Sequence, residues 1–164
     1  MESFATQLRT YIIRPTLGNM GMFSQAAENL LVGTAAHESN GFVALKQYHN
    51  GPALSFYQIE PATHDDLWQN SVPGIRRRMP QAIETLESLV AKQYASQPPA
   101  SYLIKSLSYA TAVARLLYWR APFTMPEADD IEQLAVIYKQ YYNTHLGKAT
   151  TKDFMEAYEK HCKK

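Results

Sequence analysis

The sequence predicts a single all-α domain over residues 1–164. This length is typical of one domain with a sizeable core. Apolar residues recur at three- and four-residue spacing in several segments, which is the spacing of one helix face. Prolines, glycines and small polar residues stand at the edges of these segments, where helices begin and end. The hydrophobic share of 46% and the charged share of 19% are ordinary for a folded protein.

The clearest helix is expected to begin after Ser24, whose hydroxyl can accept a hydrogen bond from a free backbone N–H of the first turn. Asn40 and Gly41 are expected to end it, because both tolerate the left-handed backbone that often follows a helix. Before it, residues 3–13 are expected to form a short helix that stops at Pro15. The apolar stripe of the main helix consists of Ala27, Leu30, Leu31, Thr34, Ala35 and Glu38.

Residues 42–60 are expected to form a loop region or a small hairpin, because Asn50-Gly51-Pro52 is a turn signal. The basic cluster Arg76–Arg78 lies between prolines and is interpreted as a solvated loop rather than a phosphate-binding patch. Further helices are predicted at 61–68, 80–94 and 101–120, then from a cap at Asp129 or Asp130 through Tyr142, and finally at 154–158 behind a capping arrangement at Thr150–Asp153.

Two of these helices have a defined inward face. In the helix 80–94, the apolar face includes Ile83, Leu86, Val90 and Tyr94. The helix 101–120 is longer and more apolar, so we expect it to be the most enclosed one.

Glu38 is the candidate catalytic residue. Its position places the carboxylate at the end of a buried helix face, near the negative end of the helix dipole. Desolvation and the dipole both disfavour the ionised form, so both raise the pKa of this carboxyl. A carboxyl that stays protonated near neutral pH can protonate a leaving oxygen. The alternative is a structural glutamate that accepts backbone hydrogen bonds from a neighbouring loop.

Two segments carry a resemblance to a known family. They are Glu38-Ser39 followed by Gly41, and Ser55-Phe56-Tyr57-Gln58-Ile59 followed by Pro61-Ala62-Thr63. In this order they resemble the lytic transglycosylase and goose-type lysozyme group. The run from Ile13 to Leu17 and on through His64 also looks like small phage-encoded proteins of that kind. The resemblance implies a lysozyme-like helical domain.

The same resemblance implies the chemistry. Glu38 would be the acid, and later the base, that cleaves the bond between N-acetylmuramic acid and N-acetylglucosamine. Ser39 matches the serine beside the acid, Gln58 matches a glutamine of the sugar groove, and Tyr57 is a candidate sugar contact. No metal or organic cofactor is implied. Either an anhydro product or a hydrolysed product would be compatible with the pattern.

A third element of the family is a tyrosine on a late helix that closes over the acid. Its best counterpart here is Tyr141-Tyr142-Asn143 followed by Gly147, which makes Tyr142 and Asn143 candidate substrate contacts. The spacing to Gly147 is longer than in the family. Tyr138 therefore competes with Tyr142 for the role.

The sequence also departs from the family pattern. Ser55 and Phe56 replace smaller or different residues, and they could narrow the groove. Glu60 is an additional carboxylate, which could act as a second catalytic group or simply favour the start of a helix. His64-Asp65-Asp66 is discounted as a metal site, because consecutive helical residues point in different directions.

The partners expected are peptidoglycan glycan strands and other phage virion proteins. A net charge of +1 gives no indication of nucleic-acid binding, and no stretch is long enough to span a bilayer. The N-terminus lacks the pattern of a secretory signal, so the chain is expected to be made in the cytoplasm and delivered to the cell wall by a phage particle or a lysis system. The alternatives are a non-catalytic virion protein that keeps the fold, and a helical adaptor without a sugar site.

Overall fold

The computed structural model describes residues 1–143 and 147–163. This part of the chain is helical and contains no strand, so the all-α prediction is confirmed. The helices are α1 (Phe4–Leu8), α2 (Arg14–Asn19), α3 (Gln25–Glu38), α4 (Pro61–Asp66), α5 (Val72–Arg78), α6 (Pro80–Ser88), α7 (Tyr102–Lys105), α8 (Leu107–Trp119), α9 (Ile131–Ile137) and α10 (Thr151–His161). Three π-helical segments, Arg9–Ile13, Leu67–Ser71 and Tyr138–Asn143, and a 3-10 turn, Lys92–Tyr94, accompany them.

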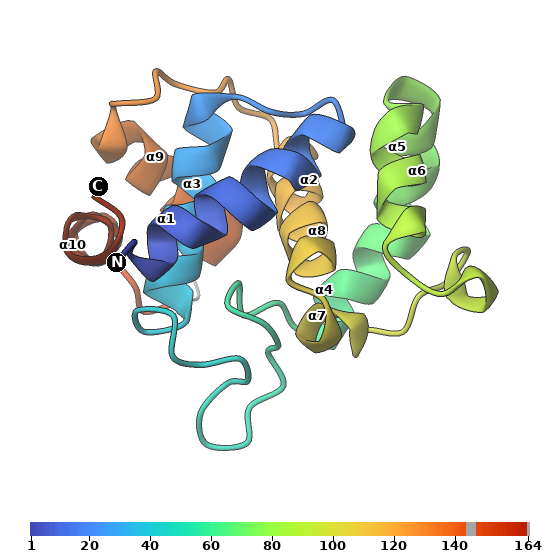
Figure 1. Cartoon of the computed structure of the whole chain (residues 1–164), viewed down its shortest axis with the longest axis horizontal. Coiled ribbons are helices and arrows are strands. Elements are labelled where there is room, and N and C mark those ends of the chain that lie inside the picture. Colours follow the sequence, from blue (N-terminus) through green and yellow to red (C-terminus); the bar gives the residue numbers. More distant parts are fainter. Residues whose placement is uncertain (144–146, 164) are drawn as a thin grey trace.

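Helix α8 lies in the middle of the molecule, with α3, α9 and α10 on one side of it and α5 and α6 on the other (Figure 1). Its residues from Tyr109 to Ala114 are fully buried. The prediction that this segment is the most enclosed one agrees with that position. The predicted helix 101–120 is nevertheless two helices, because Ser106 leaves the helical conformation and its hydroxyl caps α8 by accepting from the N–H of Tyr109.

Two prolines lie inside continuous helical runs, and one of them, Pro15, was expected to stop a helix. The first run passes Pro15 and ends at Asn19, and the second continues past Pro73 to Arg78. A π-helical segment precedes each proline, and in both cases a backbone N–H reaches the carbonyl five residues back. A π-helical segment widens the helix locally, and the helix can accommodate steric constraints from side chains at such a point. The prediction of a stop at Pro15 is therefore wrong.

The basic cluster Arg76–Arg78 lies in the last turn of α5 and not in a loop. The predicted exposure of its side chains is confirmed. Arg76 forms an ion pair with Glu87 of α6, and the Arg78 guanidinium lies over the Trp119 ring at 4.7 Å from its centroid. The cluster thus joins α5 to its neighbours.

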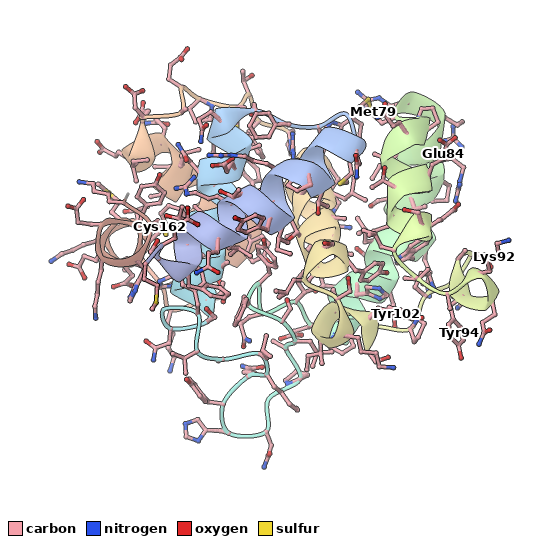
Figure 2. The ribbon with its side chains drawn as sticks, viewed as in Figure 1. Met79, Glu84, Lys92, Tyr94, Tyr102 and Cys162 are labelled. Atoms are coloured by element: carbon pink, nitrogen blue, oxygen red, sulfur yellow. The ribbon has the colours of Figure 1, made fainter. Side chains whose placement is uncertain are left out.

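Helix α6 ends at Ser88, six residues before the predicted end. Tyr94 belongs to the separate 3-10 turn and is 41% exposed, so its assignment to the buried face is wrong. Figure 2 shows Lys92 and Tyr94 on a segment that projects from the body of the molecule. The inward positions of Ile83 and Leu86, which are fully buried, are confirmed.

Both ends of α3 follow the prediction. The Ser24 hydroxyl accepts a hydrogen bond from the N–H of Ala27 at 3.0 Å. At the other end, Asn40 and Gly41 have φ angles of +54° and +76°, and the N–H of Gly41 reaches the carbonyl of Ala36 at 2.8 Å. The reversal of the backbone at this point turns the chain away from α3 directly after Glu38.

The segment 42–60 is a folded loop with isolated bridges between Lys46 and Leu54 and between Leu54 and Ile59. Its backbone is unusual, because the non-glycine residues with positive φ in the described ranges all lie between positions 40 and 58. They are Asn40, Phe42, His49, Asn50, Ser55 and Gln58. Non-glycine residues rarely adopt this conformation, and it concentrates at functional sites in many proteins.

The last helix begins with the predicted cap, in which Thr150 and Asp153 exchange hydrogen bonds between side chain and backbone. It continues past Tyr158 to His161 and packs along α3. Cys162 follows it and is buried at the position labelled in Figure 2. Its sulfur lies 3.6 Å from the carbonyl oxygen of Val32, so the end of this helix is attached to the core.

Candidate active site around Glu38

Glu38 lines a cavity of about 810 Å³. The walls come from the end of α3, the loop 42–60, the start of α4, the end of α8 and the π-helical segment after α9. Besides Glu38 the lining residues are Gln47, Ala53, Gln58, Ile59, Glu60, Thr63, Leu117, Arg120, Tyr141, Tyr142, Asn143, Gly147 and Lys148. Polar and aromatic side chains with one acid at a helix end are suited to a carbohydrate ligand.

The Glu38 carboxyl accepts a hydrogen bond from the Tyr138 hydroxyl at 2.6 Å. Burial raises the pKa of Glu38 to about 6, and the hydrogen bond from Tyr138 acts in the opposite direction. In the described ranges no backbone N–H donates to this carboxylate, so it does not have the loop-capping geometry of the structural alternative. A carboxyl in this condition exchanges a proton close to neutral pH.

Tyr138 is the tyrosine that contacts the acid. The Tyr142 hydroxyl instead donates to the backbone carbonyl of Tyr57 at 2.6 Å, and the Tyr142 ring stacks on that of Tyr118 at a centroid distance of 5.0 Å. Tyr142 nevertheless lines the cavity. Tyr138 therefore lies against the Glu38 carboxyl, whereas Tyr142 lies in the cavity wall.

Ser39 and Tyr57 lie in the core and do not line the cavity. The Ser39 hydroxyl donates to the carbonyl of Ala35 at 2.6 Å and accepts from the N–H of Phe42 at 2.8 Å. The Tyr57 hydroxyl is paired with that of Thr111 at 2.8 Å. These bonds fix the end of α3 and the loop beneath it. Both residues support the cavity from behind instead of presenting a side chain to it.

Gln58 and Asn143 do line the cavity. The side-chain amide of Gln58 donates to the carbonyl of Ser55 at 2.8 Å. The Asn143 side-chain oxygen accepts from the Lys139 ammonium at 3.0 Å. Each amide is thus oriented by a neighbour within its own segment.

Two of the residues that depart from the transglycosylase-like pattern, Ser55 and Phe56, lie outside the cavity wall. Ser55 is fully buried, and Phe56 is buried against Phe4 and Phe42, with ring centroids at 5.5 and 6.1 Å. The added bulk therefore lies in the core and does not narrow the cavity. Glu60 is exposed and lines the same cavity as Glu38.

Arg120 and Lys148 are charged residues of the wall that were not selected from the sequence. Arg120 directly follows α8, and its Nη1 donates to Asp66 and Ser71 at 2.8 and 3.1 Å. Neither residue belongs to a recognisable motif. Only the meeting of separate elements brings them to the cavity.

His64 belongs to the core on the other side of α4. Its Nε2 lies 2.7 Å from the Tyr109 hydroxyl and its Nδ1 lies 2.9 Å from Asp65. Within residues 1–143 and 147–163 no group of three or more histidine, cysteine or carboxylate side chains could hold a metal ion.

Another acid of α3, more deeply buried than Glu38, was not identified from the sequence. Glu28, in the first turn of α3, is fully buried and receives hydrogen bonds from Arg9 at 2.9 Å and from Arg14 at 2.6 Å. It lies at the opposite end of α3 from the cavity. Its role is therefore structural.

The comparisons with known proteins give no assignment: no family model, no curated protein sequence and no solved structure matches this chain. None of the described helices is both long enough and apolar enough to cross a bilayer. The helical fold class and the geometry around Glu38 are thus the basis for any functional statement.

Proposed function

We propose that this protein cleaves the glycan strand of peptidoglycan with Glu38 as general acid. The observation that carries the proposal is a partly buried carboxyl that accepts a hydrogen bond from a phenol in a polar and aromatic cavity. The resemblance of the segments around Glu38 and Gln58 to transglycosylases and goose-type lysozymes names the substrate. Burial raises the pKa of Glu38 to about 6, so a large share of the molecules carries the required proton in weakly acidic solution.

The reaction needs a proton donor in its first step and a proton acceptor in its second step. Glu38 gives its proton to the bridging oxygen while the bond from that oxygen to the anomeric carbon breaks. The resulting carboxylate then takes a proton from the nucleophile, which is water or a hydroxyl of the same sugar. The Tyr138 hydroxyl donates to the carboxylate in the intermediate state, when the charge on Glu38 is greatest.

Delivery by a phage particle or a lysis system remains part of this proposal. A non-catalytic virion protein with the same fold is the competing function. The changed residues Ser55 and Phe56 would favour it if they narrowed the groove, but both side chains are buried outside the cavity wall. That support is removed, and the competing function becomes the outcome that a negative test would favour.

The test is digestion of purified peptidoglycan sacculi, with the released fragments read by mass spectrometry. The wild type is compared with Glu38→Gln and with the matched variant Glu60→Gln, which changes the other carboxylate of the cavity. We expect muropeptides from wild type and Glu60→Gln, and at least about a hundredfold less from Glu38→Gln. Anhydro ends would indicate a transglycosylase, and reducing ends a hydrolase.

Equal release by wild type and Glu38→Gln would contradict the mechanism. If the folded wild type releases no muropeptides at any pH, the result favours the non-catalytic virion protein. Loss in both Glu38→Gln and Glu60→Gln would show a two-carboxylate mechanism instead.

A further inference from the structure

The Tyr138 ring is surrounded by aromatic side chains from three elements. It stacks on Phe154 of α10 with a centroid distance of 5.0 Å and an interplanar angle of 29°. Tyr142 stacks beside it at 6.0 Å, and the His37 ring makes a T-shaped contact with it at a centroid distance of 5.3 Å. Tyr138 is itself fully buried. These contacts determine where its hydroxyl lies.

Phe154 reaches Tyr138 only because α3 has no side chain at Gly33. A Cβ built on Gly33 would lie 2.5 Å from Cζ of Phe154 and 3.1 Å from the Tyr158 ring. Real Cβ atoms do not approach other heavy atoms so closely, so the Phe154 ring occupies the volume that any other residue at position 33 would fill. Helices α3 and α10 are therefore in close contact at this point.

The geometry points to Phe154, seated against Gly33, as a positioning residue that sets the Tyr138 hydroxyl against the Glu38 carboxyl. The inference rests on the proposed function only for its effect on catalysis. The arrangement itself is a chain of contacts from Gly33 through Phe154 and Tyr138 to Glu38. It assigns to the last helix a role at a cavity whose wall it does not form.

A hydrogen bond weakens steeply as its donor and acceptor move apart. The bond from Tyr138 to Glu38 is 2.6 Å long, and a displacement of the phenol by about 1 Å would put it outside hydrogen-bonding range. In Phe154→Leu the flat stacking surface is lost while the site stays apolar. The Tyr138 ring can then tilt into the vacated space.

The readout is the pKa of Glu38 itself, followed by carbon-13 NMR of labelled glutamate and assigned with Glu38→Gln. The Tyr138 hydrogen bond lowers the pKa of Glu38, so its loss should raise that pKa. We expect Phe154→Leu to raise it by about half a unit or more. This titration needs no substrate, so it can succeed or fail independently of the peptidoglycan assay.

The matched control is Phe123→Leu. Phe123 stacks on Tyr141 at 5.3 Å and an interplanar angle of 25°, so the same change is made at another ring stack without touching Tyr138. We expect the pKa of Glu38 to stay at its wild-type value in Phe123→Leu. An equal rise in both variants would show a general loosening of the fold and would overturn the proposal.

A second pair of variants separates positioning from stability. Gly33→Ala should displace Phe154, and Gly33→Ala combined with Phe154→Leu should recover melting temperature, because the new methyl group fills the space left by the ring. We expect the raised pKa of Glu38 to persist in the double variant, which still lacks the stacking surface. A wild-type pKa of Glu38 in folded Phe154→Leu would overturn the proposal outright.

Discussion

Helix α3 carries a fully buried carboxylate, Glu28, near its start and a partly buried one, Glu38, at its end, and the two differ in the partner that they meet. Burial on its own would raise the pKa of Glu28, but the hydrogen bonds from Arg14, Arg9 and Gln25 outweigh it and lower the pKa. At Glu38 burial dominates, and the only opposing contribution is a neutral phenol, so the pKa rises to about 6. The charge of the partner, more than the depth of burial, decides whether a buried acid keeps its proton.

The comparison predicts different stability losses on removing the two charges. Glu28→Gln leaves the buried Arg9 guanidinium without its counter-ion and should reduce the free energy of unfolding by about 3–5 kcal/mol. Glu38→Gln removes no partner of opposite charge, so a much smaller change is expected there. Urea unfolding of both variants at neutral pH measures the difference. Similar losses in the two variants would contradict the assignment of Glu28 as the structural acid.

The pH dependence of stability should also differ between the two ends. The folded-state pKa of Glu38 is about 6, above its ordinary value of 4.5, so the folded protein binds this proton more tightly than the unfolded chain does. The contribution of this proton to the free energy of unfolding is fully present below the pKa of Glu38 in the unfolded chain. It is lost as pH rises through the folded-state pKa of about 6. The loss amounts to about 2 kcal/mol.

Unfolding free energies measured between pH 4 and 7 in wild type and Glu38→Gln isolate that contribution. Glu28 should act in the other direction, because its pKa is lowered in the folded state. Its contribution is present above the unfolded pKa and is lost as pH falls through the folded one. Parallel curves for wild type and Glu38→Gln would show that folding does not raise the pKa of Glu38.

Tyr138→Phe tests the neutral partner directly. The change removes one hydroxyl and should cost about 1 kcal/mol of stability, since the hydrogen bond to Glu38 is lost. The pKa of Glu38 should rise, which moves the basic limb of any pH–activity profile to higher pH. Tyr142→Phe is the control, because its hydroxyl bonds to a backbone carbonyl and not to the acid. A shift in Tyr142→Phe alone would reverse the roles of the two tyrosines.

The smallest effect is expected at the cap that starts α3. Ser24→Ala removes the hydrogen bond to the N–H of Ala27 and should cost about 0.5–1 kcal/mol. Thermal unfolding is sensitive enough to detect it. The pKa of Glu38 should be unaffected, because a cap at one end of a helix acts on its own first turn.

The parts of this molecule that sequence could predict are those with local causes. The cap at Ser24 and the reversal at Gly41 depend on residues within a few positions, and both were predicted. The choice between Tyr138 and Tyr142 could not be made, because residues four apart share a helix face. A π-helical segment begins at Tyr138 and changes the direction of every side chain after it.

The buried placement of Ser39 and Tyr57 has a different cause. Whether a polar side chain faces a cavity or the core depends on the elements that pack against it, and for Tyr57 the partner is Thr111 of α8. The ion network of Glu28 was missed for the same reason, since Arg9 comes from a helix nineteen positions earlier. A single sequence contains no record of such pairings.

The contact between Gly33 and Phe154 also has a consequence for the order of folding. It joins positions separated by most of the chain, so a very long loop must close before it can form. Contacts of this kind tend to form late, after local helices have been established. The site at Glu38 should therefore acquire its final proton affinity in one of the last folding steps. A stopped-flow refolding experiment would then detect it after most of the helical signal has recovered.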